Sequence, residues 1–358
     1  MKISIVLNTF NNINQLRTIL SQFKLIQNSR KKNLFFFTII DDSSSDGTFQ
    51  EIQKFININK LQIEHLLTNS ENIGISESRN KAIKLNFDKD YLLFIDGDDY
   101  LDLSNFLKID FLKFNSDLIC FNFTYKNISN EKYKINTFYK SKKIINKNEK
   151  ISYFVKYMEK PNRMSLFTTC WAKFYRVNFL KTHNIFFNKH LKLCEDTYFV
   201  FRILNLNSKV EYFPNPFYIH TISDGIENLN KLTFGVNFDL KHQLSFIKPS
   251  KSVWFYLLSN KVFDKNLLRK KFNHLITSYF IIYSIRSMLR SNSLCKFFIN
   301  YFFWRSVYSK NIFRNALGDY SVIKARGNKI LYFLLKWKMF FLFILYAFMI
   351  SKRRYMKK

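Results

Sequence analysis

Two groups of acidic residues have types and spacing that could do chemistry. The first is Asp96, Asp98 and Asp99, which directly follow the apolar run Tyr91 to Ile95. Carboxylates this close repel one another and raise one another's pKa, so a positive partner is expected beside them. Mg²⁺ or Mn²⁺, held by one or two carboxylates and by substrate phosphate oxygens, would supply that charge. The alternative is a solvated, Asp-rich turn before the next helix.

The second group is the pair Glu195 and Asp196. Apolar residues at Phe199, Ile203 and Leu204 follow it with the spacing of one helical face, so the pair is expected at the start of a helix. A carboxylate there can act as a general base on a hydroxyl. It can also simply cap the helix, which is a common reason for an Asp at that position.

Alternating strand and helix patterns in the first hundred residues are expected to position these groups. Short apolar runs at 3–10, 34–40, 63–67 and 91–95 are separated by segments with helical spacing. This alternation predicts a parallel sheet covered by helices on both faces. Ligands bind such sheets beyond the carboxyl ends of the strands. The polar residues at those ends are Asn8-Thr9, Asp41-Asp42 and Asp96 to Asp99.

Four sequence blocks carry a resemblance to a known family. The blocks ISIVLNTFNN, IIDDSSSDGT, NSENIGISESRNKAI and LLFIDGDD occur in this order within the first 105 residues. Together they resemble the nucleotide-sugar-binding half of family 2 glycosyltransferases. The resemblance implies an α/β fold of the GT-A type, Rossmann-like, with a mostly parallel sheet and helices on both faces. A mostly helical, basic C-terminal region is expected to follow.

The resemblance also implies roles for individual residues. The donor-binding positions that it implies are Asn8, Thr9, Phe10, Asp41, Asp42, Asn72, Gly74, Arg79, Asn80 and Asp96. The implied metal ligands are Asp98, Asp96 and Asp99, with Asp98 the first choice. The family usually has Pro-Thr-Tyr or Pro-Ser-Tyr where this chain has Asn8-Thr9-Phe10. Phe10 keeps the ring for stacking but lacks the hydroxyl.

The second acidic group also matches the family. Family members place a Glu-Asp pair at this distance from the D-x-D motif, with the Asp as general base and a W-x-K-x-Y motif upstream. Here these residues are Glu195 and Asp196, with Trp171, Lys173 and Tyr175. The resemblance therefore assigns Asp196 and Glu195 to catalysis and Lys173 to the donor site.

The expected function is an inverting, metal-dependent hexosyltransferase. It would move a hexose or N-acetylhexosamine from a UDP-sugar to a hydroxyl of a glycan or lipid-linked glycan acceptor. Such an acceptor would belong to a bacterial surface glycan, namely lipopolysaccharide, lipooligosaccharide or capsule. The alternatives are a non-catalytic protein and a protein that binds nucleic acid or another polyanion. No nucleic-acid-binding motif occurs, so no nucleic acid partner is expected. The G-x-G-x-x-G of dinucleotide enzymes does not follow the first strand.

The C-terminal third carries most of the net positive charge. The whole chain has a formal net charge of +31, and residues 251–358 contain many Lys and Arg but only Asp264 and Asp319 as acids. This asymmetry indicates that the C-terminal third contacts a polyanionic surface, either an anionic membrane surface or nucleic acid, and the long apolar runs favour the membrane. Part of the excess has the plainer explanation that Lys, Asn, Ile and Phe are abundant throughout, as in proteins from AT-rich genomes.

An apolar segment, Met339 to Ile350, lies near the C-terminus. It is shorter than the roughly 20 residues that span a bilayer, so a helix lying in the membrane surface is expected. Trp337, Tyr346 and the Arg353-Arg354 pair would hold it there. A buried core helix and a true span are the alternatives. We expect three regions: residues 1–105 for the nucleotide-sugar, 106–230 for the acceptor and catalytic base, and 231–358 for membrane association.

Four scattered cysteines, with no C-x-x-C spacing, argue against a disulfide framework and against a zinc site. The first residues read as a strand, and no signal-peptide pattern precedes it. We therefore expect a cytoplasmic protein that is peripheral at the inner face of the cytoplasmic membrane.

Overall fold

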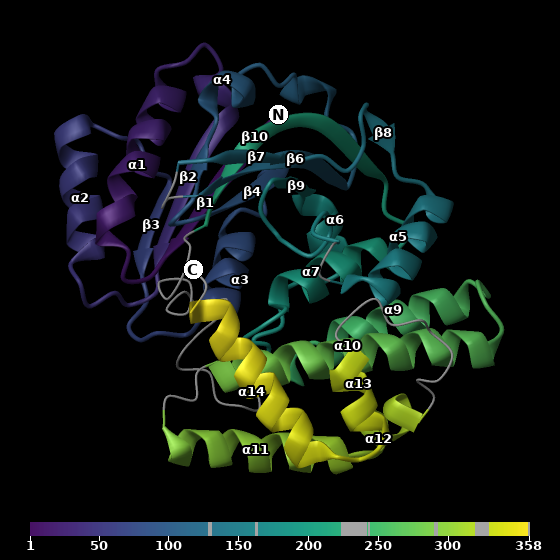
Figure 1. Cartoon of the computed structure of the whole chain (residues 1–358). Coiled ribbons are helices and arrows are strands. Elements are labelled where there is room, and N and C mark those ends of the chain that lie inside the picture. Colours follow the sequence, from purple (N-terminus) through teal and green to yellow (C-terminus); the bar gives the residue numbers. More distant parts are fainter. Residues whose placement is uncertain are drawn as a thin grey trace. The chain divides into compact units, whose positions relative to one another are not determined.

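A computed structural model of the chain describes residues 1–127, 131–161, 164–222, 242, 244–289, 293–318 and 329–356 (Figure 1). The chain divides into two compact units. The first comprises Met1–Lys150 and Ser165–Asp224, and the second comprises Ile151–Met164 and Gly225–Lys358. Each unit is described by itself below.

The first hundred residues form the alternating strands and helices that the sequence predicts. In chain order they are β1 (Ile3–Thr9), α1 (Ile13–Gln27), a 3₁₀ turn (Lys32–Leu34), β2 (Phe35–Asp41), α2 (Thr48–Asn59), β3 (His65–Thr68), α3 (Ile75–Leu85) and β4 (Tyr91–Asp96). The four strands are parallel and lie in the order β3-β2-β1-β4. This half of the sheet matches the expected parallel arrangement.

The remainder of the first unit extends the same sheet with mixed pairing. Its elements are β5 (Tyr100–Leu101), α4 (Leu103–Phe106), a 3₁₀ turn (Phe111–Lys113), β6 (Leu118–Asn127), β7 (Tyr133–Asn136), β8 (Lys143–Ile144), α5 (Lys147–Glu159), β9 (Lys173–Arg176), α6 (Val177–Thr182), α7 (Glu195–Leu204) and β10 (Val210–Ile222). Strand β9 lies antiparallel between β4 and β6, and β6 pairs in parallel with β10. The expectation of a mostly parallel sheet therefore holds for the first four strands, whereas β5, β7, β8 and β9 pair antiparallel to their neighbours.

Helices cover both faces of the sheet, as predicted (Figure 1). On one face α1 packs against the parallel strands, and the Phe23 and Phe37 rings stack with centroids 4.5 Å apart. On the other face Phe94 of β4 meets Phe199 of α7 edge to face. The near-continuous apolar sequences of β1 and β4 follow from this burial on two sides.

The register of the parallel strands brings their polar ends together. Asn8 of β1 lies between Ile40 and Asp96, and Thr9 pairs with Asp41. The carboxyl ends of β1, β2 and β4 therefore meet at one edge, where a sheet of this kind binds its ligands.

The second unit is helical. It contains most of α5 and the helices α9 (Ile247–Ser259), α10 (Lys265–Leu289), α11 (Leu294–Ser309), α12 (Asn311–Gly318), α13 (Lys329–Lys336) and α14 (Phe340–Met356). Phe280 of α10 contacts the rings of Trp304 and Phe343, and the Trp304 indole donates to Ser287 Oγ at 2.6 Å. Among the described residues, no helix is both long and apolar enough to cross a membrane.

Candidate donor-binding and catalytic site

A buried arginine joins the two acidic groups that the sequence singles out. Arg79, on α3, donates from Nη2 to Asp96 Oδ1 at 2.7 Å and from Nη1 to Asp196 Oδ1 at 2.6 Å. Its side chain is 4% exposed, and Glu195 lies 3.7 Å from the same Nη1. Arg79 is thus a positive partner for Asp96 within the chain, whereas the divalent cation expected at the D-x-D motif stays a prediction.

Asp196 does not cap helix α7. The helix begins at Glu195, and the preceding residue, Cys194, is in the left-handed conformation with φ of 60°. Asp196 instead accepts a hydrogen bond from the backbone N–H of Cys170 at 3.0 Å, in addition to that from Arg79. Two donors therefore fix the orientation of this carboxylate, which excludes the capping alternative.

Two carboxyl groups beside Arg79, those of Glu195 and Asp96, have raised pKa values. Desolvation and, to a smaller extent, the charge of Asp196 raise the pKa of Glu195 to about 8, although Arg79 opposes the rise. Desolvation also raises the pKa of Asp96, to about 6, because it outweighs the opposing charge of Arg79. At neutral pH the cluster therefore holds Glu195 protonated, and fewer negative charges surround the single guanidinium.

Asp99 is buried, and its carboxylate makes its contacts within the protein. Its side chain is fully buried and accepts from the Tyr218 hydroxyl at 2.7 Å and from the Thr221 N–H at 2.8 Å, and it pairs with His220 Nδ1 at 2.9 Å. Burial lowers the pKa of His220, but the charge and hydrogen bond of Asp99, together with the charges of Asp96 and Asp98, outweigh this effect and raise that pKa. These contacts fasten the turn after β4 to β10.

The D-x-D motif offers the oxygen donors that a hard divalent cation prefers. Asp98 and Asp96 are partly exposed, whereas Asp99 uses both oxygens within the fold. In the described part of the chain no three His, Cys, Asp or Glu side chains converge on one point. A magnesium-type ion needs only one or two carboxylates when substrate phosphates complete its shell, so Asp98 with Asp96 fits this chemistry.

The acidic pair after β2 organises the surrounding loops. Asp41 accepts from the Ser44 N–H at 2.9 Å and from the Thr68 hydroxyl at 3.2 Å. Asp42 accepts from the backbone N–H groups of Ile73 and Gly74, at 3.0 and 2.8 Å. Gly74 has φ of +87° and ψ of 155°, which strongly favours glycine. The segment before α3 is therefore held against the end of β2.

Unpartnered polar atoms lie at the end of β1. Asn8 Nδ2 and Thr9 Oγ1 are buried without a hydrogen-bond partner, and so is Ser76 Oγ at the start of α3. Burying such groups unpaired costs free energy, so sites like this usually contact a ligand or water. Phe10, the next residue of the same strand end, is 38% exposed and presents a ring there.

Other residues implied by the family resemblance have different surroundings. Asn72 is exposed. Asn80 pairs through both ends of its amide with the backbone of Phe187, at 3.0 and 2.8 Å. Lys173 is buried in β9 and donates to Thr169 Oγ1 and to the Trp171 carbonyl, both at 3.1 Å. The contacts of Asn80 and Lys173 are thus to the protein itself. Either residue would therefore affect donor binding indirectly, by positioning the residues that it contacts.

Several residues that build the site were only weakly indicated by the sequence. Trp171 stacks on Tyr218 and on His220, with ring centroids 5.0 and 4.8 Å apart. The N–H of Cys170, just before it, orients Asp196. Only the W-x-K-x-Y motif indicated Trp171, and the sequence favoured a structural role for His220, because a lone His beside aromatic residues is more often structural.

Comparisons with known proteins identify relatives in sequence and in fold. Residues 4–183 match the family model described as Glycosyl transferase family 2. A curated relative, poly(ribitol-phosphate) beta-N-acetylglucosaminyltransferase TarS of Staphylococcus aureus (strain MW2), is 26% identical over 235 residues, which are 63% of this chain and 36% of the relative. The chain thus spans about a third of the length of the curated relatives it matches.

Solved structures show the same fold. S. aureus TarS 1–349 in complex with UDP-GlcNAc has a TM-score of 0.59 and 18% identity, covering 99% of this chain and 92% of the other. The complex of the same fragment with UDP has a TM-score of 0.58 and 17% identity, with the same coverage. At this level of identity the likeness establishes the fold, and it confirms the expected GT-A type with its helical C-terminal region.

Proposed function

The chain belongs to glycosyltransferase family 2, and we propose that it transfers a hexose or N-acetylhexosamine from a UDP-sugar to a hydroxyl group with inversion. One observation carries this proposal most directly. Arg79 holds the first aspartate of the D-x-D motif and the candidate base, Asp196, on opposite sides of one guanidinium. Asp96, a candidate ligand of the metal that would bind the diphosphate, and Asp196, the candidate general base, thus lie within reach of a single substrate.

In the proposed reaction Asp196 acts as the general base. The acceptor hydroxyl attacks the anomeric carbon as Asp196 takes its proton, a carbon–oxygen bond to the acceptor forms, and the bond to the diphosphate breaks. UDP leaves with the electron pair of the broken bond. A single displacement inverts the anomeric centre and needs no nucleophile from the enzyme. Arg79 and the Cys170 N–H would keep the carboxylate oriented for this step.

The donor would occupy the edge formed by β1, β2 and β4. Asn8 and Thr9 have buried polar atoms that a nucleotide could satisfy, and Phe10 offers an exposed ring for the base. Asp42 and Gly74 would support this pocket through the loop they hold together.

Asp98 and Asp96 are the residues that would hold a divalent cation. Such an ion, Mn²⁺ or Mg²⁺, stabilises the negative charge that develops on a departing diphosphate. Asp99 would act indirectly, because its contacts to Tyr218, His220 and Thr221 fix the position of the D-x-D turn.

UDP-GlcNAc is the first donor to test, because the similar TarS fragment is known in complex with that nucleotide sugar. The acceptor proposed from the sequence is a bacterial surface glycan such as lipopolysaccharide, lipooligosaccharide or capsule. The name of the curated relative adds poly(ribitol-phosphate) as an acceptor class for this chain. Both classes present hydroxyl groups on an extended polymer, which is the chemistry that Asp196 would serve.

The test measures release of UDP from UDP-GlcNAc, UDP-GalNAc, UDP-Glc and UDP-Gal, with Mn²⁺ and with an excess of chelator. We expect one of these donors to support Mn²⁺-dependent turnover. Asp196→Asn should reduce it by about 10²–10⁴-fold while leaving UDP affinity unchanged, because general-base catalysis contributes rate enhancements of that order.

Asp98→Asn should instead weaken the Mn²⁺-dependent binding of UDP. Asp110→Asn is the matched control, since that residue makes an exposed surface pair with Lys113. Full turnover in Asp196→Asn would refute the assigned base, and turnover that chelator does not reduce would refute the metal dependence.

A further inference from the structure

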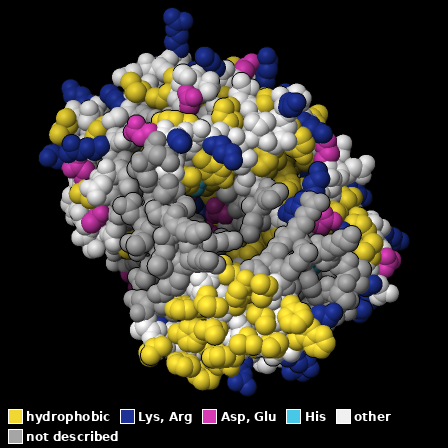
Figure 2. All heavy atoms as spheres, in the orientation of Figure 1, with side chains coloured by type: hydrophobic (Ala, Val, Ile, Leu, Met, Phe, Trp, Pro, Cys, Tyr) yellow, Lys and Arg dark blue, Asp and Glu magenta, His cyan; other side chains and the backbone are white. Residues whose placement is uncertain are grey.

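The second unit exposes aromatic and aliphatic side chains on three neighbouring helices. They are Phe298 and Phe302 on α11, Phe333 on α13 with Trp337 just after it, and Phe341 and Met349 on α14. Each is between 46% and 63% exposed. We call these six residues the apolar face. Figure 2 shows apolar side chains gathered over this group of helices.

The apolar face is not the core-facing side of these helices. On α11 the residues Phe297, Trp304 and Val307 are buried and pack inward. Phe298, Phe302 and Arg305 follow the opposite helical face. On α14 the residues Phe343 and Ile344 are buried, whereas Phe341 is exposed. Each helix thus has one apolar side for the core and a second that no described element covers.

Direct contacts make the exposed side chains one surface. The Tyr301 ring of α11 lies 5.7 Å from that of Phe341 on α14, and the Tyr308 hydroxyl donates to the Leu335 carbonyl of α13 at 3.3 Å. The Phe333 and Trp337 rings are 6.1 Å apart. Contiguous apolar surface on this scale indicates a site of contact with another apolar phase or partner.

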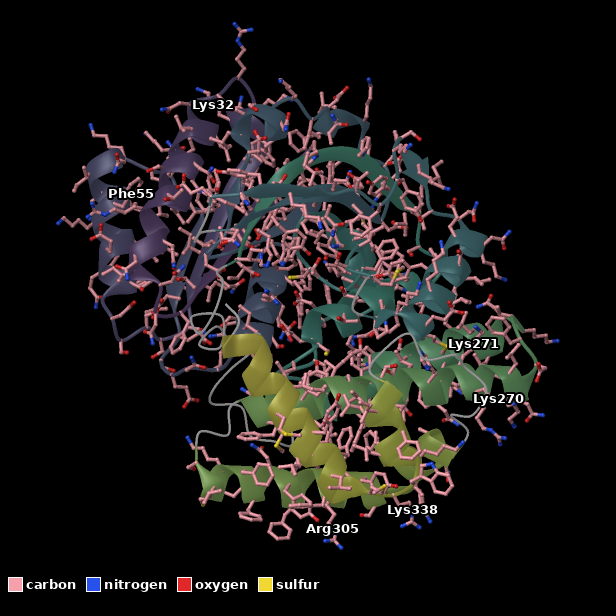
Figure 3. All side chains as sticks on the ribbon, in the orientation of Figure 1. Lys32, Phe55, Lys270, Lys271, Arg305 and Lys338 are labelled. Carbon is pink, nitrogen blue, oxygen red and sulfur yellow. The ribbon has the colours of Figure 1, made fainter. Side chains whose placement is uncertain are left out.

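The charge around the apolar face has a single sign. The described segments 293–318 and 329–356 contain Lys and Arg but no Asp or Glu. Lys296, Arg305, Lys310, Lys336 and Lys338 are exposed among the apolar residues. Figure 3 shows Arg305 and Lys338 projecting outward at the edge of these helices. Exposed aromatic residues bordered by basic ones favour the interface of an anionic bilayer.

We propose that the apolar face docks this protein onto an anionic lipid bilayer, with the aromatic rings among the headgroups and the basic residues on lipid phosphates. The sequence pointed to the segment Met339 to Ile350 alone as a helix lying in the membrane surface. The structure gives that segment a mixed role, because Phe340, Phe343, Ile344 and Ala347 are buried in the core. The docking surface gains its largest exposed rings from α11 and α13.

Vesicle binding of the full chain tests the proposal. Flotation with phosphatidylcholine vesicles is compared with flotation on vesicles containing roughly 30% phosphatidylglycerol, at low and at high salt. We expect binding to the anionic vesicles that weakens as salt rises. Trp337 supplies a second measurement, since it is 63% exposed whereas Trp171 and Trp304 are buried. Its emission should shift to the blue when anionic vesicles are added.

Phe302→Ser, Phe333→Ser and Phe341→Ser combined should reduce vesicle binding by at least about tenfold, because each ring loses its burial in the interface. Arg305→Gln with Lys338→Gln should weaken binding to anionic vesicles by about fivefold per charge and leave weak binding to neutral vesicles unchanged. Ile58→Ser, Leu112→Ser and Ile135→Ser are the matched control, since these exposed apolar residues lie in the first unit. Circular dichroism and UDP binding would establish that each variant is folded.

Wild-type binding by the triple phenylalanine variant would overturn the proposal, as would a failure of the wild-type chain to bind anionic vesicles. A dimer that the same variant dissociates, without any vesicle binding, would assign the apolar face to self-association instead. The outcome is separable from the proposed reaction, because Asp196→Asn should bind vesicles as the wild-type chain does.

Discussion

At the scale of single residues, Arg79 is the group on which the candidate site depends. It is buried, it contacts both Asp96 and Asp196, and its guanidinium plane matches two carboxylates at once. Family resemblance implied a contact to the nucleotide. The geometry adds a positioning role, because the guanidinium holds the candidate base at a fixed place relative to the D-x-D motif.

Replacing Arg79 by Met should lower the free energy of unfolding by about 3–5 kcal/mol, because it leaves two partly buried carboxylates without their cation. Chemical denaturation measures the change. The loss should shrink in the double variant with Asp196→Asn, since one uncompensated charge is then absent. Arg17→Met is the control, because Arg17 is 70% exposed and pairs only at the surface with Glu51. An equal loss of unfolding free energy in Arg79→Met and in Arg17→Met would contradict this explanation.

Glu195 makes stability depend on pH. Its pKa is about 8 in the folded chain and near 4.5 ordinarily, so the folded state keeps a proton that the unfolded state loses. Stability should therefore fall as pH rises from about 4.5 to about 8. Glu195→Gln should remove this penalty, adding roughly 1–3 kcal/mol at pH 8 after allowance for its coupling to Asp196, and almost nothing at pH 4.5.

Thermal unfolding across this pH range measures the difference between the two proteins. The exposed Glu71 supplies the control through Glu71→Gln. A constant difference between wild type and Glu195→Gln at every pH would show that Glu195 titrates normally.

At the scale of elements, the ends of β1, β2 and β4 could be predicted from the sequence. The contacts between residues far apart in the sequence could not. Apolar runs that stop at Asn8, Asp41 and Asp96 reveal buried parallel strands and their binding edge. The short strand β9 gave little pattern, yet it separates β4 from β6. The bond from Arg79 to Asp196 joins residues 117 positions apart, and no periodicity reports such a contact.

Asp99 illustrates the same limit within one motif. Spacing alone treats the three aspartates of the D-x-D turn alike, because each follows the same buried strand. Only the return of β10 beside the turn distinguishes them, since Tyr218, His220 and Thr221 all contact Asp99. The turn is therefore anchored by one aspartate and leaves the other two at the candidate site.

Asp99→Asn should consequently act on stability. An amide at this position would direct donor hydrogens at the Tyr218 hydroxyl or the Thr221 N–H, so we expect a loss of about 2–4 kcal/mol. Asp98→Asn is the paired control, because its side chain is partly exposed and it should keep a melting temperature near that of the wild type. Thermal unfolding without metal decides between them. A larger loss in Asp98→Asn than in Asp99→Asn would show that the anchoring role is misassigned.

At the scale of the whole molecule, charge and apolar surface are unevenly distributed. The sequence alone identified the basic C-terminal third, and an anchor at Met339 to Ile350 was the natural interpretation. Periodicity could not show that α14 packs against α10, because apolar residues occur on every side of this helix. Its burial depends on the fold of the second unit, in which Phe343, Ile344 and Ala347 are all fully buried.

Deleting Met339 to Lys358 would therefore do more than remove a membrane contact. It would strip Phe340, Phe343 and Ile344 from the core around Phe280, and each large side chain contributes about 2–5 kcal/mol there. The sum is comparable to the 5–15 kcal/mol that stabilises a typical domain, so the second unit should unfold. Near-ultraviolet circular dichroism and binding of a hydrophobic dye measure this, with Met349→Ser as the folded control because Met349 is 52% exposed. A truncated chain with a native aromatic spectrum would show that α14 is dispensable for folding, and only then would its loss of vesicle binding report on the membrane contact alone.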